Sequence, residues 1–216
     1  MKIFISSDME GTAGVVDWSQ CLPGEREYEY YRRLLQDEVN AAIDGAQLAG
    51  ATSFLVNDSH SSMQNLLPDQ LHGRAAYLSG RHKPLYMMQG LDASFHGCFF
   101  VSYHGSKSAE PSALSHTYNP RAIAEVVLNG LHPDVACELI GDAAKRTLQR
   151  RHQPPVIDLP ATLEVRFRHA DLAQMATWLR GVERTGTSTV SMTDDDPLRL
   201  YRTFVTAVCL TRGVAE

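Results

Sequence analysis

The sequence predicts an α/β protein: a three-layer, mostly parallel sheet with helices on both faces, followed by a small C-terminal α+β portion. Two observations carry this prediction. Apolar, strand-like segments recur at 2–7, 53–56 and 97–103, and a helical pattern separates the first two of them. A strand, helix, strand order implies parallel pairing through a crossover. We expect residues 1–155 to form the α/β domain and residues 156–216 the smaller portion.

In the first half of the chain, residues 2–7 are short, apolar and rich in β-favouring residues, as in a buried strand. From about 25 to 49, apolar residues recur at helical spacing, and Gly50 provides a C-terminal stop. Strands follow at 53–56 and 97–103. Between them, segment 61–96 contains scattered prolines and glycines, which indicate connections and a short strand at 75–78.

In the second half, residues 122–128 form an extended stretch closed by the turn pair Asn129-Gly130. Pro133 suits a first helical turn, so we expect a helix from there to about residue 150, followed by a connector at 153–155. The remaining pattern predicts a strand at 162–167, a helix at 170–179, a strand at 188–192 and an amphipathic helix at 198–210.

Composition argues against several functional classes. A net charge of −5, with 44% hydrophobic and 21% charged residues, is that of an ordinary folded protein without a basic surface, so nucleic acid is not an expected partner. The N-terminus has no signal-like apolar core and no apolar run approaches bilayer length, so we expect a cytoplasmic protein without a membrane partner. The four cysteines are widely spaced, which favours reduced thiols over a disulfide framework or a thiolate metal site: Cys21, Cys98, Cys137 and Cys209.

Groups able to bind metal follow three of the predicted strands. Asp8 and Glu10 come after the first strand, His60 after the second and His104 after the third. Because functional groups collect at the carboxyl ends of parallel strands, these four side chains are expected to converge. Neighbouring carboxylates repel unless they share a proton or a cation, and two imidazoles complete a donor set suited to zinc. A site holding two ions, with Asp8 as the bridge, would suit hydrolysis.

His116 follows the third strand closely and is a candidate catalytic histidine, donating a proton or stabilising an oxyanion. From spacing alone, purely structural roles stay open: Asp8 could cap a loop, and His60 could be part of a polar helix start after Asp58-Ser59. The acidic run at 194–196 is interpreted as a solvated turn and helix cap. The other histidines follow no strand end of this kind and are assigned to the surface: His72, His82, His96, His132, His152 and His169.

Four motifs occur in an order that resembles a known family. They are Ser7-Asp8-Met9-Glu10-Gly11, Val56-Asn57-Asp58-Ser59-His60, Tyr103-His104 and Leu114-Ser115-His116-Thr117. The chain resembles the DppA-type D-aminopeptidases, the M55 family of zinc peptidases. The resemblance implies a two-zinc aminopeptidase, a hydrolase acting on short peptides with N-terminal D-amino acids and built as a ring-like homo-oligomer. It implies that Asp8 bridges the metals, Glu10 and His60 complete one site, His104 belongs to the other and His116 is catalytic.

The sequence also departs from this family. After Gly130 the chain passes directly to Leu131-His132-Pro133, which is similar to a later helix of the family. The stretch that is missing includes a glutamate ligand, and neither Glu125 nor Glu138 matches it by motif. We therefore expect one zinc, held by Asp8, Glu10 and His60, and a weak site at His104.

Three hypotheses remain open on these residues: an active metallo-aminopeptidase, a non-catalytic metal- or peptide-binding relative that has lost one metal position, and an aberrant shortened gene product. A nucleotide-binding α/β protein is disfavoured. The glycines after the first strand lack the lysine of a phosphate-binding loop and the spacing of a dinucleotide fingerprint.

Overall fold

A computed structural model describes residues 1–105, 112–116, 121–130 and 159–211 of the chain. These residues form two compact units. The first contains residues 1–105 and 112–115, and the second contains residues 116, 121–130 and 159–211. Each unit has its own sheet, and each is described by itself.

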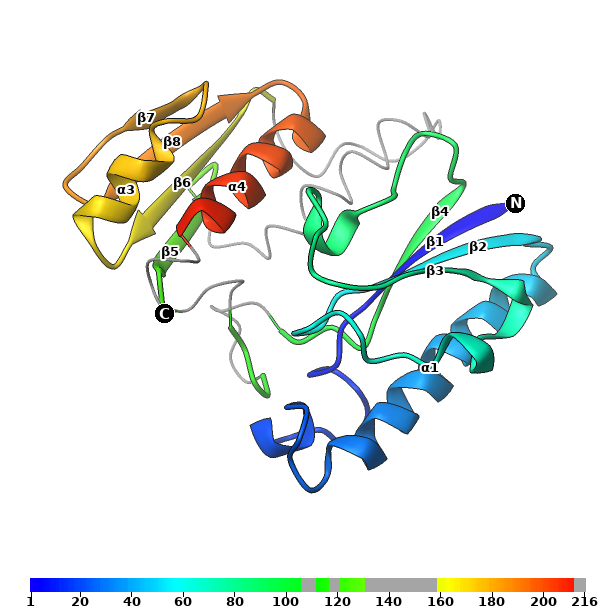
Figure 1. Cartoon of the computed structure of the whole chain (residues 1–216). Coiled ribbons are helices and arrows are strands. Elements are labelled where there is room, and N and C mark those ends of the chain that lie inside the picture. The colour runs from blue at the N-terminus through cyan, green and yellow to red at the C-terminus, as the bar shows by residue number, and fades with distance from the viewer. Residues whose placement is uncertain (106–111, 117–120, 131–158, 212–216) are drawn as a thin grey trace. The chain divides into compact units, whose positions relative to one another are not determined.

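The first unit is built on a parallel sheet with the strand order β3-β2-β1-β4 (Figure 1). The central strands β1 (Lys2–Ser7) and β2 (Ser53–Asp58) pair over their whole length, with Ser7 opposite Asp58. The outer strands are β3 (Ala76–Leu78) and β4 (Gly97–Val101), and Val101 also lies opposite Ser7. Three strands therefore end at the same level, so the loops that follow them start side by side.

The long helix α1 (Tyr28–Leu48) packs on one face of this sheet, as Figure 1 shows. Its buried residues Leu35, Val39 and Ile43 form one apolar cluster with alternate residues of β1 and β2. The opposite face is contacted by a one-turn 3-10 helix, η4 (Tyr86–Met88), whose Met87 carbonyl accepts a hydrogen bond from Ser6. Three further 3-10 turns lie in the connections: η1 (Trp18–Gln20), η2 (Pro68–Gln70) and η3 (His72–Arg74).

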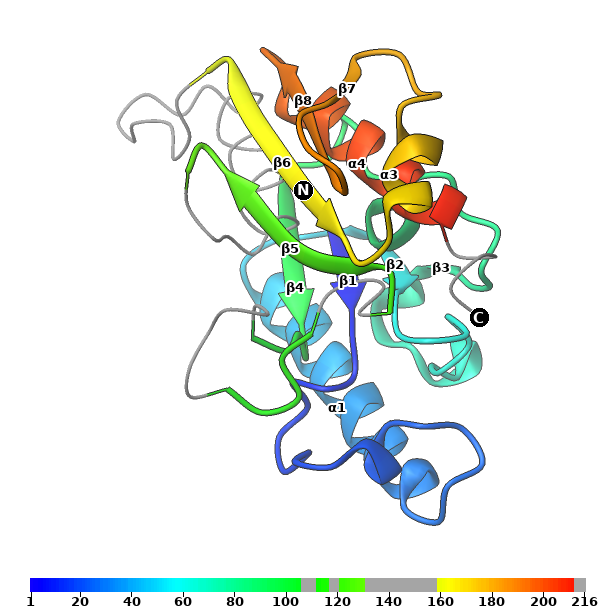
Figure 2. The same cartoon turned by 90° about the vertical axis from the view of Figure 1, so that its left-hand side faces the viewer.

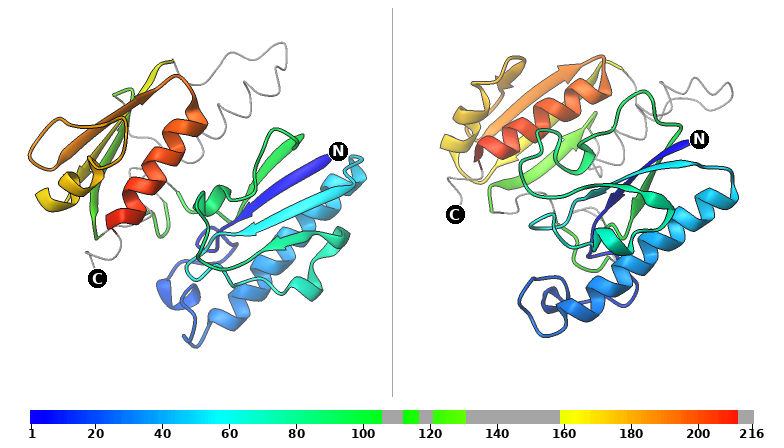
Figure 3. Two further views of the ribbon diagram at one scale, coloured as in Figure 1. Left: turned by 45° about the horizontal axis from the view of Figure 1, so that its top comes forward. Right: turned by 45° about the vertical axis from the view of Figure 1, so that its right-hand side comes forward.

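The second unit is an antiparallel sheet with the strand order β5-β6-β8-β7, seen along its length in Figure 2. Its strands are β5 (Ile123–Leu128), β6 (Ala161–Phe167), β7 (Val182–Arg184) and β8 (Thr189–Asp194). Helices α3 (Ala170–Ala176) and α4 (Pro197–Thr211) cover one face of this sheet (Figure 3). In β6, Leu163, Val165 and Phe167 are buried while the residues between them are exposed, as expected for a strand with one covered face.

The predicted fold class is confirmed: a parallel sheet with helices, followed by an antiparallel α+β portion. The extended stretch at 122–128 is a strand, but it pairs with β6 in the antiparallel sheet. The two compact units divide between residues 105 and 116, whereas the boundary predicted at residue 155 lies outside the described residues and remains a prediction. The helix expected after Pro133 and the connector at 153–155 lie outside the described residues. In the described part of the chain, no helix has the length and apolar character needed to cross a bilayer.

Candidate metal centre

The three aligned strand ends bring the candidate ligands together. Backbone hydrogen bonding continues past the strands, because the Asp8 amide donates to the Val101 carbonyl (2.9 Å) and the Ser59 amide donates to the Ser7 carbonyl (2.8 Å). Asp8 and Glu10 lie in the loop after β1, and His60 lies in the loop after β2. One ligand atom from each of these three side chains lies within 4.8 Å of the others. This is the convergence that the parallel topology predicts.

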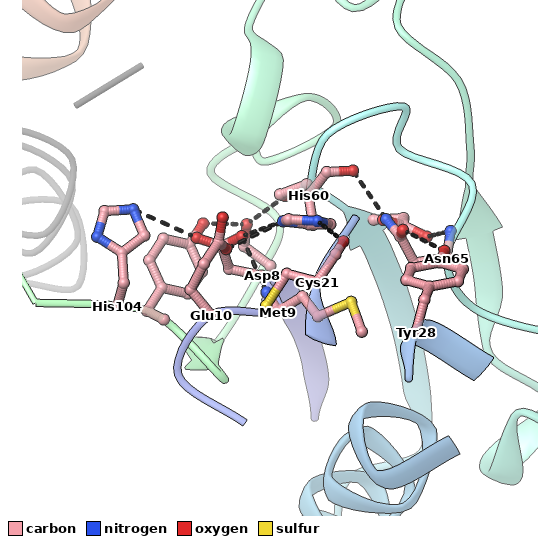
Figure 4. Close-up of polar contacts among 12 residues, drawn as sticks. Asp8, Met9, Glu10, Cys21, Tyr28, His60, Asn65 and His104 are labelled. Carbon is pink, nitrogen blue, oxygen red and sulfur yellow. Dashed lines mark hydrogen bonds and ion pairs between the residues drawn. The ribbon is translucent and has the colours of Figure 1, made fainter. Parts of the chain in front are cut away.

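The three side chains are buried, and both carboxylates lie on the Nδ1 side of the His60 ring (Figure 4). His60 Nδ1 is 3.0 Å from Glu10 Oε2 and 3.4 Å from Asp8 Oδ1. The side chains of Asp8, Glu10 and His60 are 4%, 3% and 4% exposed to solvent. Two acids and an imidazole thus share a small, nearly dry volume.

His104 lies on the other oxygen of Asp8. Its Nε2 is 3.6 Å from Asp8 Oδ2, and Figure 4 shows the ring on the far side of the carboxylate from His60. Asp8 therefore has one histidine near each of its oxygens. A carboxylate in this position can contribute an oxygen to each of two adjacent cation positions.

Backbone carbonyls determine the tautomer of both histidines. His60 Nε2 is 2.8 Å from the Cys21 carbonyl oxygen, and His104 Nδ1 is 2.6 Å from the Gly105 carbonyl oxygen. A carbonyl oxygen only accepts, so each of these nitrogens carries a hydrogen. In the neutral rings the other nitrogen, His60 Nδ1 or His104 Nε2, then presents a lone pair toward Asp8. Metal-binding histidines are typically oriented in this way, by donating from the nitrogen that does not bind the metal.

Without a cation, this arrangement is electrostatically unfavourable. Burial, together with the charge of Glu10, raises the pKa of Asp8 to about 7. Burial alone lowers the pKa of His60, but the hydrogen bonds and charges of Asp8 and Glu10 outweigh it and raise that pKa to about 10. Protons therefore occupy the cluster at neutral pH, in the positions that a divalent cation would take.

The donor set fits zinc. Asp8 Oδ2 is buried and accepts no hydrogen bond from any residue that the structure describes, although it lies 3.6 Å from His104 Nε2, so it is available as a metal ligand. Two carboxylates and two oriented imidazole nitrogens are common zinc ligands. Within the described residues, Asp8, Glu10 and His60 are the one group of three side chains close enough to hold a metal ion.

A buried carboxylate orders the loop that carries His60. Asp58 is fully buried and accepts hydrogen bonds from the amides of Asn65 (2.5 Å) and Leu66 (2.9 Å), from the Asn65 side chain (2.7 Å) and from the Tyr77 hydroxyl (2.8 Å). Asn65 Nδ2 also donates to the His60 carbonyl at 2.8 Å. Hydrogen bonds thus connect the end of β2 and His60 to the same short segment, Asn65 and Leu66.

The structure brings together the four residues that the sequence singled out as metal ligands, and their role as ligands remains a prediction. His116, the predicted catalytic histidine, belongs to the second compact unit, so its role also remains a prediction. Sequence reasoning missed the parts played by Asp58, Asn65 and the Cys21 carbonyl. For Asp58 a signal was present: a carboxylate at the buried end of a strand, two residues before a candidate ligand.

The chain is similar in sequence to a known protein. The chain is 39% identical over 138 residues to a D-aminopeptidase of Bacillus subtilis (strain 168), an alignment that covers 60% of this chain and 50% of that protein. In this comparison, the chain spans about half the length of its curated relative.

A solved structure is also similar: the Zn-dependent D-aminopeptidase DppA from Bacillus subtilis, a self-compartmentalizing protease. It matches with a TM-score of 0.80 and 25% sequence identity, covering 97% of each chain. The family model described as Peptidase_M55, D-aminopeptidase, matches residues 1–132 and 130–206. Its two matched segments meet at residues 130–132, where the sequence analysis locates the missing stretch. The chain belongs to the M55 family of D-aminopeptidases.

Proposed function

We propose that this chain is a zinc-dependent aminopeptidase that hydrolyses short peptides with N-terminal D-amino acids, of the D-Ala type. The observation that carries the proposal is the buried cluster of Asp8, Glu10 and His60, with His104 near the second oxygen of Asp8, which accepts no hydrogen bond from the described residues. Buried acids held this close without a cation cost stability, so their arrangement is best explained by a metal-dependent function.

Glu10 and His60 would hold one ion, His104 would hold a second, and the two oxygens of Asp8 would be shared between them. Zinc, when bound, supplies a Lewis acid for the scissile carbonyl and lowers the pKa of an attacking water. The Cys21 and Gly105 carbonyls keep the two imidazoles in the required tautomer. His116 is proposed to donate a proton or to stabilise the developing oxyanion.

The substrate class and the assembly state are supported by relatives. The D-aminopeptidase of Bacillus subtilis supports D-amino-acid peptides as substrates. The related solved structure, a self-compartmentalizing protease, supports a homo-oligomer, and we propose a ring-like one.

A second candidate function is a weakly active or non-catalytic metal- or peptide-binding protein. One observation favours it: among the described residues, the His104 position has Asp8 as its carboxylate, and no further acid joins that group. Two protein ligands hold a zinc ion poorly compared with the three or four of established sites.

One experiment separates these candidates. Purified protein is stripped with a chelator, titrated with zinc, and assayed at each step for release of D-alanine from D-Ala-D-Ala and from D-alanyl-p-nitroanilide, with the L-isomers as controls. Turnover that is lost on chelation and restored by zinc supports the peptidase. Folded protein that binds one zinc and releases no D-alanine supports the second candidate, and folded protein that binds no zinc contradicts both.

A further inference from the structure

A carboxylate outside the metal cluster contacts two of the three loops that carry the candidate ligands, those after β1 and β4. Glu38 lies on α1, and its Oε1 accepts a hydrogen bond from the Ala13 amide at 2.8 Å. Its Oε2 accepts a hydrogen bond from the Ser102 hydroxyl. Ala13 belongs to the loop that contains Asp8 and Glu10, and Ser102 lies two residues before His104. One side chain therefore joins the loops on either side of the Asp8–His104 pair.

These two loops are also in direct contact with each other. The Gly11 amide donates to the Ser102 carbonyl at 2.8 Å. A Cβ atom on Gly11 would lie 2.0 Å from the Tyr103 carbonyl oxygen, so the backbones approach more closely than any side chain at residue 11 would permit. The separation between Asp8 and His104 therefore depends on how the loop after β1 rests on the loop after β4.

Ser102 holds an unfavourable backbone conformation at this contact. Its φ is 59°, in the left-handed region that residues other than glycine seldom adopt. Such a conformation persists where surrounding contacts impose it. Residues in conformations of this kind are often found at functional sites. Here the contacts are the hydrogen bond from the Gly11 amide to the Ser102 carbonyl and the hydrogen bond from the Ser102 hydroxyl to Glu38.

We propose that Glu38 is a positioning residue: it fixes the distance between Asp8 and His104 by holding Ser102 in its left-handed conformation against the loop after β1. This inference rests on the proposed metal site. It goes beyond that site because the hydrogen bonds that the structure describes for Glu38 go to Ala13 and Ser102 rather than to the candidate metal ligands, so Glu38 acts through loop geometry. A carboxylate accepts stronger hydrogen bonds than a neutral group does, so Glu38 is suited to hold both loops.

Two variants test the role of Glu38. In Glu38→Ala, both hydrogen bonds are lost. In Glu38→Gln, the amide oxygen still accepts from the Ala13 amide and the amide nitrogen donates to the Ser102 hydroxyl, which can accept. Asp37→Ala is the matched control, because it removes an exposed carboxylate from the neighbouring position of the same helix.

The first measurement is amide hydrogen exchange in the metal-free protein. We expect the Gly11 amide to exchange at least about 10-fold faster in Glu38→Ala. Its rate should be unchanged in Glu38→Gln and Asp37→Ala. The Ile5 amide, within β1, serves as the internal reference and should keep its rate in all variants. Uniformly faster exchange at Ile5 and Gly11 alike, or unchanged exchange at Gly11, would overturn the inference.

The second measurement is zinc affinity by competition with a chromophoric chelator. Glu38→Ala should weaken the second ion by about 10- to 100-fold, the usual effect of losing a group that orients a ligand, with a smaller effect on the first ion. Ser102→Ala should reproduce this loss, and the double variant Glu38→Ala/Ser102→Ala should be no weaker than either single variant. Additive losses would contradict a shared mechanism.

The outcomes also separate this inference from the proposed function. Wild-type protein that binds no zinc refutes the proposed function, while the exchange rate of Gly11 still decides the role of Glu38. Wild-type protein that binds two ions, together with Glu38→Ala protein that binds both with unchanged affinity, refutes the inference alone. If wild-type protein binds one ion, the exchange measurement decides.

Discussion

The two units of this chain use polar residues in opposite ways. In the first unit, charged side chains such as Asp8, Glu10 and Asp58 are buried at the ends of parallel strands. In the second unit, the buried side chains that the structure describes are apolar, and charged pairs such as Arg166–Glu125 lie at the surface. Burying charge costs stability unless each group is paired or binds a cation. The comparison indicates that the second unit is built for stability, whereas the first buries charge at a cost in stability that the proposed metal site would explain.

The largest expected effect is the loss of zinc binding, which tests whether the buried acids are metal ligands. Asp8→Ala removes the carboxylate that has one oxygen near each of the two histidines, so it should abolish zinc binding and peptidase activity. The exposed carboxylate of Asp44, which pairs with His72, provides the control, and Asp44→Ala should bind zinc as wild type does. The measurement is zinc content after dialysis, with circular dichroism to show that the variants are folded. Zinc retained by Asp8→Ala would remove the basis of the comparison.

The next effect tests the apolar core of the second unit. Phe204 on α4 is 1% exposed, and Phe204→Ala should lower the free energy of unfolding by about 4 kcal/mol through the loss of packing and the creation of a cavity. Zinc stoichiometry of the folded variant should not change. Urea denaturation and zinc titration measure the two quantities. A loss of zinc with normal stability would show that this helix serves the metal site rather than the core.

Dependence on pH sharpens the contrast within the first unit. The pKa values of Asp8 and His60 are raised in the metal-free protein, to about 7 and about 10, so their contribution to stability falls as pH rises through these values. Zinc must displace the same protons, and its apparent affinity should increase by about 10-fold per pH unit for each proton released. Thermal melts with and without zinc across this pH range should therefore diverge as pH rises. Parallel curves would contradict a shared site for protons and zinc.

A smaller effect is expected at Glu10, where the stability of the metal-free protein and the zinc affinity should change in opposite directions. Glu10→Gln removes one of two buried carboxylates next to His60, leaving Asp8 to pair with that histidine. We expect the metal-free variant to be more stable than wild type by about 1 kcal/mol, and its zinc affinity to be lower. Differential scanning calorimetry and zinc competition report the two changes. A destabilised metal-free variant would show that Glu10 supports the fold.

The smallest effect is expected at the surface of the second unit. Glu125 pairs with Arg166 at 2.9 Å, and both side chains are more than one third exposed. Glu125→Gln should change the free energy of unfolding by less than about 0.5 kcal/mol, because exposed ion pairs contribute little. Thermal denaturation at low and high salt checks this. A loss as large as that of Phe204→Ala would contradict the division of roles drawn here.

Much of the first unit could be predicted because its signals are local. Residues 2–7 and 53–56 are short apolar runs that end in polar groups, and parallel topology requires such ends to meet. Helix α1 follows from its apolar spacing alone. The convergence of Asp8, Glu10 and His60 follows from the sequence for the same reason.

Other features depend on contacts that a sequence does not display. The strand at 123–128 was predicted, but its partner, β6, lies more than thirty residues away, so its sheet was not assigned. Strand β7 has three residues, too few for a periodic pattern. Glu38 is one of several acids on a helix, and only its contact with two distant loops distinguishes it. The sequence does not show which side chains that are far apart along the chain are in contact.

Both histidines on Asp8 are oriented by main-chain oxygen atoms, those of Cys21 and Gly105. A substitution changes the side chain at a position and leaves its peptide carbonyl in place. Alanine at residue 21 would therefore leave the oxygen that orients His60 in place, and alanine at residue 105 would report a clash instead, because its Cβ would lie 1.9 Å from Ser112 Oγ. Probing these carbonyls calls for a change in the backbone itself, such as an ester in place of the amide that follows residue 21.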